Sequence, residues 1–301
     1  MSLRCDSNFS ESAIQIQEWR DSAIEKKQQV IERLEDEGRD DLAAPLITCG
    51  ESISLTCCNC GNLSEAFTHC KKRWCPVCIR GLTAKKAARY RGGAMEMRWP
   101  LMVTFTVKNY SDASIDFFRE IKQGFRKLRK QQWFRGCVTG GVFAIEVTNT
   151  GKGWHPHGHG IFDCRWFGVS MDAPSPHLSP EAKKKHYTRN AREVSEQWSL
   201  VMGRKGNVHT RRVWTREGQN RGDAVTEAMK YSVTPETLIE SPDDIAPVID
   251  MMTGQRLCVP FGSMFGRLKA DDDDAAEKGC QCAECSLRGY IMPTKLALRG
   301  M

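Results

Sequence analysis

The sequence predicts an α+β protein in which an antiparallel sheet packs against helices, with a cysteine-rich module on its N-terminal side. Short β-branched runs alternate with amphipathic segments through the middle of the chain. A turn-forming segment, 149–153, joins two of these runs. Cysteines are concentrated between Cys49 and Cys78. Strand pairs joined by helices are typical of an antiparallel sheet covered by helices on one face.

The individual elements follow from hydrophobic spacing and from turn residues. β-Branched, apolar runs of strand length predict the strands 100–108, 142–148, 155–162 and 208–214. Phe117, Ile121 and Phe125 repeat at helical spacing, and capping residues mark the ends of other helical segments. The predicted helices are 11–37, 82–90, 113–130, 179–203 and 223–233, the last stopped by Pro235.

Composition divides the chain into four segments, because cysteine, charge and apolar periodicity change along it. The segments are an accessory helix with its linker (1–45, the linker being 38–45), a zinc-binding cysteine-rich module (46–92), a catalytic domain (93–265) and an acidic linker with a cysteine-rich tail (266–301).

Hydropathy argues against a membrane or secreted protein, and the distribution of charge favours one that binds nucleic acid. No apolar run approaches the roughly 20 residues that cross a bilayer, and the first ten residues do not resemble a secretory signal. We therefore expect a soluble, cytoplasmic protein without a membrane partner. The net charge of +7 is modest, but basic residues gather in three stretches, which favours contact with nucleic-acid phosphates. The stretches are 71–91, 122–130 and 183–212.

The most informative segment is Trp154-His-Pro-His-Gly-His159. Three of the seven histidines fall within five positions, which favours metal binding over a chance surface group. Alternate residues of a strand share a face, so His157 and His159 project together and can hold one cation. His155 has the same parity, but Pro156 predicts that the strand begins only after it.

A carboxylate is expected beside these histidines. If the preceding turn is centred on Gly151 and Lys152, Glu146 pairs directly with His157 and lies on the same face. A slip of one residue would turn Glu146 to the other face. Two imidazoles and one carboxylate suit Mg²⁺ or Mn²⁺ acting on a phosphate, with Zn²⁺ as the competing ion.

A tyrosine helix supplies a candidate nucleophile. Glu227 and Tyr231 are four residues apart and therefore neighbours on one helix face. Tyrosine is a poor nucleophile near neutrality, since its pKa is about 10, but a metal that polarises the scissile phosphate makes a phenol adequate. Attack would leave a 5′-phosphotyrosine, and Glu227 could accept the phenolic proton or activate a second nucleophile.

The cysteines predict structural zinc. The chain shows no secretory signal, so CxxC spacing indicates metal rather than disulfides. Two such pairs are separated by fourteen residues, close to a zinc-ribbon spacing. The expected ligands are Cys57, Cys60, Cys75 and Cys78, with Cys70 as a fifth candidate and Cys49, Cys58 and His69 in reserve.

Two further predictions concern the cysteine-rich parts of the chain. Lys71, Lys72 and Arg73 lie inside the expected zinc knuckle and could contact DNA phosphates, unless the module is a purely structural knob. The tail contains a possible second site that lacks an obvious fourth ligand. It could recruit Cys258, bind a partner or hold no metal; its residues are Cys280, Cys282 and Cys285.

Together the motifs resemble the HUH endonucleases, and within them the single-tyrosine Rep proteins of small rolling-circle plasmids. Three segments match in order, over roughly residues 46–235. Each is short, but their order and distances are specific. They are Cys70-Lys-Lys-Arg-Trp-Cys-Pro-Val-Cys78, Trp154-His-Pro-His-Gly-His159 and Glu227-Ala-Met-Lys-Tyr231.

The resemblance implies a five-stranded antiparallel sheet that carries the histidine pair. It implies His157 and His159 as metal ligands, Tyr231 as the nucleophile and Glu227 as the residue that activates water at termination. The expected function is initiation of rolling-circle replication by nicking single-stranded origin DNA. No phosphate-binding loop of the Walker type is present in the sequence, so a separate helicase and a polymerase are expected as partners.

The sequence departs from the family pattern at two positions. The residue between the histidines is usually bulky and apolar, but here it is Gly158. Many relatives have a lysine three residues after the tyrosine, where this chain has Thr234. Lys230 could contact the phosphate instead, although it faces another direction on a helix.

Two other functions are compatible with these motifs. A related HUH transposase or mobilisation relaxase would share the cysteine and histidine segments, but such transposases often carry paired tyrosines, and this helix has only Tyr231. A zinc-dependent DNA-binding regulator would explain the cysteines and leave Glu227, Tyr231 and the histidines unexplained.

Overall fold

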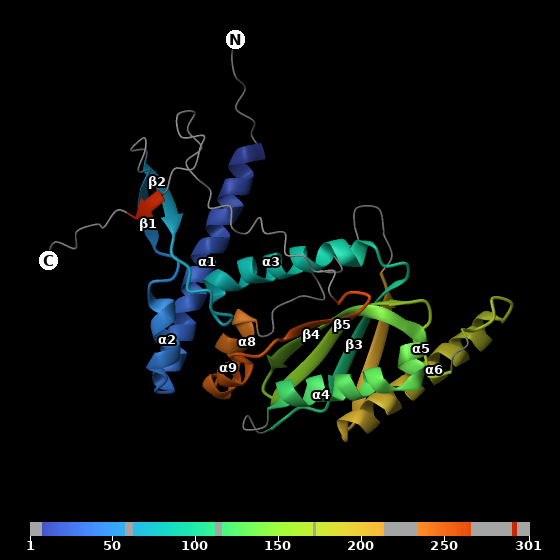
Figure 1. Cartoon of the computed structure of the whole chain (residues 1–301). Coiled ribbons are helices and arrows are strands. Elements are labelled where there is room, and N and C mark those ends of the chain that lie inside the picture. Colours follow the sequence, from blue (N-terminus) through green and yellow to red (C-terminus); the bar gives the residue numbers. More distant parts are fainter. Residues whose placement is uncertain are drawn as a thin grey trace, which may run out of the picture. The chain divides into compact units, whose positions relative to one another are not determined.

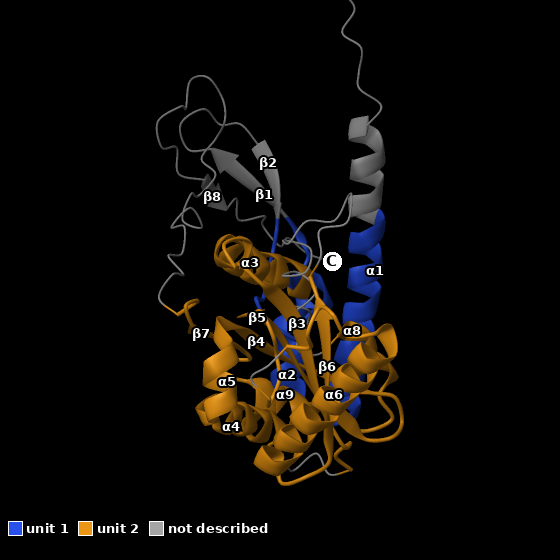
Figure 2. Cartoon of the chain, turned by 90° about the vertical axis from the view of Figure 1, so that its right-hand side faces the viewer, with its two compact units in different colours: residues 1–78, 270–301 blue, residues 79–269 orange. Residues whose placement is uncertain are grey.

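The computed structural model describes the chain from residue 8 to residue 293, with gaps (Figure 1). Two compact units are present: residues 1–78 with 270–301, and residues 79–269 (Figure 2). The division falls within helix α3 (Pro76–Met95), whereas composition suggests a boundary near residue 92. The described ranges are 8–57, 63–111, 116–170, 173–213, 234–265 and 291–293.

The first unit combines two helices with a small sheet. Helix α1 (Asn8–Asp36) agrees closely with the predicted helix 11–37 and is followed by Gly38, whose φ of 67° is the left-handed conformation that glycine adopts easily. Strands β1 (Ser52–Cys57) and β2 (Leu63–Phe67) form an antiparallel pair. The short strand β8 (Ile291–Pro293) adds to β1, so residues near the C-terminus complete a sheet that begins near the N-terminus.

The predicted linker 38–45 is wrong, because most of it forms helix α2 (Asp40–Ile47). Asp40 and Asp41 occupy the first turn, where carboxylates stabilise the positive end of a helix. Leu42 and Leu46 are buried on one face of α2. Burial of this apolar face offsets the cost of Pro45 inside the helix.

The second unit is built on a five-stranded antiparallel sheet, as the sequence predicts. The strand order is β6-β3-β5-β4-β7, and every neighbouring pair is antiparallel. The central hairpin joins β4 to β5 through the expected turn. The strands are β3 (Pro100–Val107), β4 (Val138–Asn149), β5 (Trp154–Cys164), β6 (Gly206–Arg212) and β7 (Cys258–Gly262).

One face of this sheet carries an aromatic core. Phe125 of helix α4 (Phe117–Lys130) stacks on Phe143 of β4, with ring centroids 3.9 Å apart. Helix α5 (Gln132–Cys137) adds Phe134, and helix α6 (Pro180–Met202) adds Trp198, whose ring lies 4.9 Å from that of Phe105. Apolar burial on this scale is the main force that holds helices to a sheet.

The opposite face is covered in part by α3. Its buried residues Ala87, Tyr90 and Ala94 belong to one core cluster with residues of β4, β5 and β7. Helices therefore lie on both faces of the sheet, and the expectation of helices on one face is wrong. The sheet residues of the cluster are Val142, Ala144, Ile161 and Cys258.

Two short helices precede the last strand of the sheet, α8 (Pro235–Glu240) and α9 (Ala246–Met252). Thr234 caps α8, since its hydroxyl accepts a hydrogen bond from the backbone N–H of Thr237 at 3.1 Å. The predicted helix 223–233 lies outside the described residues. Within the described ranges, no helix is both long and apolar enough to cross a membrane.

Candidate functional site

Three histidines of β5 lie on one face of the five-stranded sheet. On one side, Glu146 of β4 pairs directly with His157, and Ala144 pairs with His159. On the other side, Thr104 of β3 pairs with His159. The register of the β4–β5 hairpin is therefore the one that the turn predicts. It places Glu146 on the same face as the histidines.

His155 belongs to this row as well, because β5 begins at Trp154. The expectation that Pro156 delays the strand is wrong. The pairing of β3 with β5 ends at Thr106 and His157, so Pro156 lies beyond the paired residues of β3 and its missing N–H breaks no bond of that ladder. Pro156 still pairs in register with Val147 of β4.

His159 is held through both of its ring nitrogens. Nε2 lies 2.9 Å from Oε2 of Glu146, and Nδ1 lies 3.3 Å from Oγ1 of Thr104. The side chains of Glu146 and His159 are each 17% exposed, so the pair is accessible to a ligand without being fully solvated. A carboxylate on one nitrogen and a hydroxyl on the other orient the imidazole ring.

His157 lies between the other two histidines. Its ring centroid is 4.1 Å from that of His155 and 5.9 Å from that of His159, and its Nε2 lies 3.4 Å from Oγ1 of Thr148. Burial, together with the neighbouring His155 and His159, lowers the pKa of His157 to about 4 against the opposing effect of Glu146. Burial also lowers the pKa of His155. His157 is therefore neutral at pH 7 and able to accept a metal ion.

The distances in the row fit a small divalent cation only in part. Two cis ligands of an octahedral ion with bonds near 2.1 Å lie about 3.0 Å apart, which matches the Glu146–His159 separation of 2.9 Å. His157 lies beside this pair, but its ring nitrogens do not complete a compact group of three ligand atoms with Glu146 and His159. In the part of the chain that the structure describes, only a group of four cysteines brings three or more ligand atoms close together.

Gly158 lies between the two central histidines and faces the aromatic core. A Cβ atom at this position would meet ring atoms of Phe143 at 2.5 Å and Cβ of Phe105 at 3.4 Å. The Phe143 ring thus fills the space that a side chain at position 158 would need. This packing gives a physical reason for glycine where the resembling family has a bulky residue.

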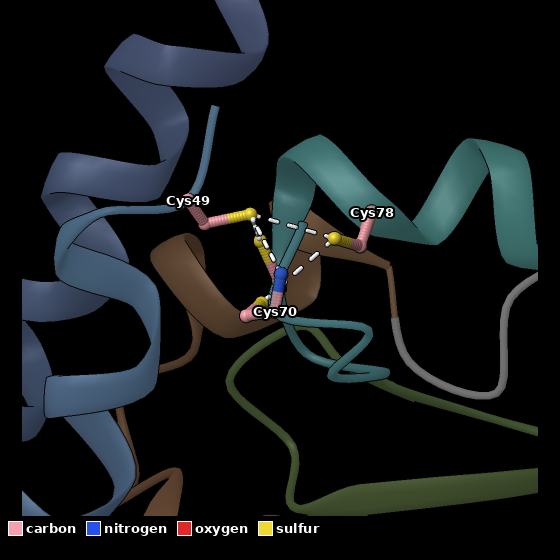
Figure 3. A group of neighbouring side chains, drawn as sticks. Cys49, Cys70 and Cys78 are labelled. Atoms are coloured by element: carbon pink, nitrogen blue, oxygen red, sulfur yellow. Dashed lines mark hydrogen bonds between the residues drawn. The ribbon is translucent and has the colours of Figure 1, made fainter. Parts of the chain in front are cut away.

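The four cysteines are Cys49, Cys70, Cys75 and Cys78, and their sulfur atoms all lie within 4.8 Å of one another. Figure 3 shows Cys49, Cys70 and Cys78 with their side chains directed toward one another. Cys49 Sγ lies 3.4 Å from Cys78 Sγ and 3.5 Å from Cys75 Sγ, and Cys70 Sγ lies 3.8 Å from Cys78 Sγ. A tetrahedral zinc with bonds of 2.3 Å needs sulfurs about 3.8 Å apart. The group can therefore hold a metal such as zinc.

This ligand set shares two members, Cys75 and Cys78, with the set expected from spacing. The fifth candidate, Cys70, is part of it, and Cys49 completes it. Cys60 lies outside the described residues, so the predicted pairing of the two CxxC motifs stays a prediction. Cys57 ends β1 and pairs with Ile291 of β8.

Several local features build the cysteine cluster. Cys78 lies in the first turn of α3, and the chain between Cys70 and Cys75 turns at Lys71, whose φ is 57°. The loop with Cys49 is anchored by Lys27 of α1, a buried lysine that donates to the carbonyl oxygen of Cys49 at 2.9 Å. An ammonium at this position would also offset the negative charge of four thiolates bound to one Zn²⁺.

The thiols of the cluster influence one another strongly. Hydrogen bonds from Cys70 and Cys75 lower the pKa of Cys78. Hydrogen bonds with Cys70 and Cys78, together with burial, raise the pKa of Cys75. Four thiols this close cannot all ionise, because the thiolates would repel one another. A metal ion bound between them would supply the positive charge that lets them ionise.

The predicted DNA-contacting residues of the knuckle are partly accessible. Lys71 is exposed, and Nζ of Lys72 lies 5.4 Å from the centroid of the Trp74 ring. Arg73 is partly buried. Cys258 lies buried on β7, and burial raises its pKa to about 11. The remaining predicted site residues, Glu227, Lys230, Tyr231, Cys280, Cys282 and Cys285, lie outside the described residues.

Sequence reasoning missed two residues on the histidine face. Thr104 contacts His159, and His209 of β6 pairs with Thr104 in the same cross-strand row. Neither could be found from local spacing, because the β3–β5 and β3–β6 pairings join segments far apart in the sequence. Comparison of the chain with family models, with curated proteins and with solved structures gave no match.

Proposed function

We propose that the protein is a metal-dependent endonuclease that nicks single-stranded DNA and initiates rolling-circle replication. The observation that carries the proposal is the contact between Glu146 and His159 on the face that His157 shares. Two imidazoles beside a carboxylate on a rigid sheet suit a divalent cation bound to a phosphate. The sequence resemblance to single-tyrosine Rep proteins of the HUH endonucleases supports the same reaction.

In the proposed reaction, the phenolic oxygen of Tyr231 attacks the scissile phosphorus. The bond from phosphorus to the 3′ oxygen breaks, the proton that the phenol releases is balanced by the one that the 3′ oxygen takes up as it leaves as a hydroxyl, and the 5′ phosphate stays on the tyrosine. His157, His159 and Glu146 would hold Mg²⁺ or Mn²⁺, which polarises the phosphate. Glu227 would activate a water or hydroxyl that releases the phosphotyrosine at termination.

The decisive experiment is a search for the covalent adduct. The zinc-loaded protein is incubated with Mn²⁺ and single-stranded DNA tiled across the replicon that carries its gene, and products are resolved by denaturing electrophoresis. We expect a protein–DNA adduct with wild type and with Tyr187→Phe, an exposed tyrosine of α6 that serves as a matched control. Tyr231→Phe should abolish the adduct and retain DNA binding. An adduct with Tyr231→Phe would contradict the assignment of the nucleophile.

The termination role of Glu227 has a separate test. Glu227→Ala should form the first adduct at a normal rate and release it more slowly, because the carboxylate is needed only for the second step. Release is followed by adding a second strand with a 3′ hydroxyl and measuring the joined product. Release at the wild-type rate would contradict the role of Glu227.

A second candidate is a zinc-dependent DNA-binding regulator. It is favoured by the four-cysteine cluster with Lys71 exposed in its knuckle. Such a protein would bind DNA and form no adduct under any metal. An HUH transposase or relaxase would also form the adduct, and sequencing of the cleaved ends distinguishes it from a replication initiator by the site that is cut.

A further inference from the structure

The edge strand β6 exposes a polar row on the same face of the sheet as the histidines. Asn207, His209 and Arg211 are exposed, whereas Gly206 and Val208 are buried on the side of α6, where the later Thr210 is exposed. The alternation follows from the strand geometry, in which successive side chains point to opposite faces. The face with Asn207, His209 and Arg211 is thus open along β6, whereas the other face is buried at Gly206 and Val208.

The cross-strand register connects this row to the candidate metal site. His209 pairs with Thr104, and Thr104 pairs with His159, so the three residues form one line across β6, β3 and β5. With neighbouring strands about 4.8 Å apart, the backbone at His209 lies about 10 Å from that at His159. The hydroxyl of Thr104 fills the middle of the line and contacts His159.

The charge of the row is positive. Arg211 donates a hydrogen bond to Sδ of Met102 at 3.5 Å, and sulfur is a weak acceptor; among the described residues no carboxylate forms an ion pair with the Arg211 guanidinium. On this face the described strands carry two carboxylates, Glu146, which contacts His159, and Asp163, which accepts from the backbone N–H groups of residues 98 and 99. Neither neutralises the guanidinium of Arg211.

We propose that the exposed row of β6 binds the phosphate backbone of single-stranded DNA beside the scissile phosphate. Alternate residues of a strand are about 6.8 Å apart, a spacing similar to that of successive phosphates in an extended single strand. A strand that follows β6 would present its phosphates to Arg211, His209 and Asn207 in turn, next to the histidine row. This inference rests on the proposed function and adds the surface that orients its substrate.

Binding to an unstructured single strand tests the inference without requiring cleavage. Fluorescence anisotropy is measured with labelled oligothymidylate of about 20 nucleotides, using zinc-loaded protein without added Mg²⁺ or Mn²⁺, over a range of salt concentrations. Arg211→Ala should weaken binding about three- to tenfold, because one charged phosphate contact is lost. The slope of log K against log salt should become shallower by about 0.7.

Further variants test whether the loss of binding depends on the β6 row. Arg211→Glu should weaken binding more than Arg211→Ala, and the double variant Asn207→Ala/His209→Ala should weaken binding even though it removes no arginine. Arg135→Ala is the matched control, since Arg135 is exposed on α5, against the opposite face of the sheet. Thermal unfolding followed by circular dichroism identifies any variant that fails to fold, and the remaining variants then decide.

The possible failures are distinguishable. If wild type forms the covalent adduct but the β6 variants bind with wild-type affinity and salt slope, the β6 surface is wrong and the proposed function stands. If wild type neither binds single strands nor forms an adduct, the proposed function fails and the inference fails with it. Equal losses in Arg135→Ala and Arg211→Ala would also overturn the inference, because binding would then depend on net charge alone.

Discussion

Glu146 pairs in register with His157, yet its carboxylate contacts His159, the residue diagonally across the hairpin, at 2.9 Å. Diagonal contacts of this kind are within reach of a long side chain on adjacent antiparallel strands. The contact joins the central strand of the sheet to its neighbour through side chains. It also brings two potential ligand atoms of the histidine row to a spacing that suits a divalent cation.

Glu146→Gln should weaken Mn²⁺ binding at least about tenfold, because a neutral amide replaces the anionic ligand while the shape of the side chain is kept. Isothermal titration calorimetry on zinc-loaded protein measures the effect. Glu196→Gln is the matched control, since Glu196 is an exposed carboxylate of α6 whose partner is Arg192. Equal Mn²⁺ affinity in wild type and Glu146→Gln would remove Glu146 from the ligand set.

Gly158→Ala should lower the free energy of unfolding by about 1 to 3 kcal/mol. The added methyl group would meet the Phe143 ring at 2.5 Å, and the close-packed aromatic core leaves that ring little room to move. The measurement is urea denaturation followed by tryptophan fluorescence. Gly92→Ala in α3 is the matched control, because no atom lies within 4 Å of the new Cβ and alanine is the better helix former. A stable Gly158→Ala protein would show that the core can repack.

Cys49→Ser should reduce the zinc content by one ion per chain and lower the melting temperature. Cys49 Sγ lies within 3.5 Å of two other sulfurs of the cluster, and serine is a poor zinc ligand. Zinc is measured by atomic emission after gel filtration. Cys137→Ser, a cysteine outside the cluster, is the control. If Cys60→Ser loses this zinc and Cys49→Ser retains it, the ligand set expected from CxxC spacing is the correct one.

Stability of the protein without a divalent ion at the histidine row should fall as pH falls from about 6.5 to about 4. Burial lowers the pKa of His157 to about 4 in the folded chain, against about 6.5 in the unfolded chain. Between these two pKa values the unfolded state binds more protons than the folded state. The free energy of unfolding therefore increases as pH rises and decreases as pH falls.

His157→Gln should flatten this part of the pH profile relative to wild type. Thermal melts at half-unit pH steps, without added Mg²⁺ or Mn²⁺, give the comparison. His177→Gln is the control, because His177 is an exposed histidine outside the sheet. Parallel profiles for wild type and His157→Gln would show that the burial of His157 does not affect stability in this range.

Much of the second unit, residues 79–269, could be predicted from local sequence. The turn at 149–153, centred on Gly151 and Lys152, determines the register of the hairpin that joins β4 to β5. That reasoning is correct for Glu146 opposite His157. The expectation for Pro156 is wrong, because proline is excluded from a strand only where its N–H would face a partner, and the pairing of β3 with β5 ends at Thr106 and His157.

Other features depend on contacts between distant segments. By itself, the sequence determined the strand periods, the histidine row with its carboxylate, and the clustering of cysteines. Only the tertiary structure decided that Cys49 joins Cys70, Cys75 and Cys78, that the Phe143 ring requires glycine at position 158, and that His209 lies in line with His159. The physical reason is that ligand geometry and packing depend on distances across the fold, whereas sequence spacing reports only neighbours along one strand or one helix turn.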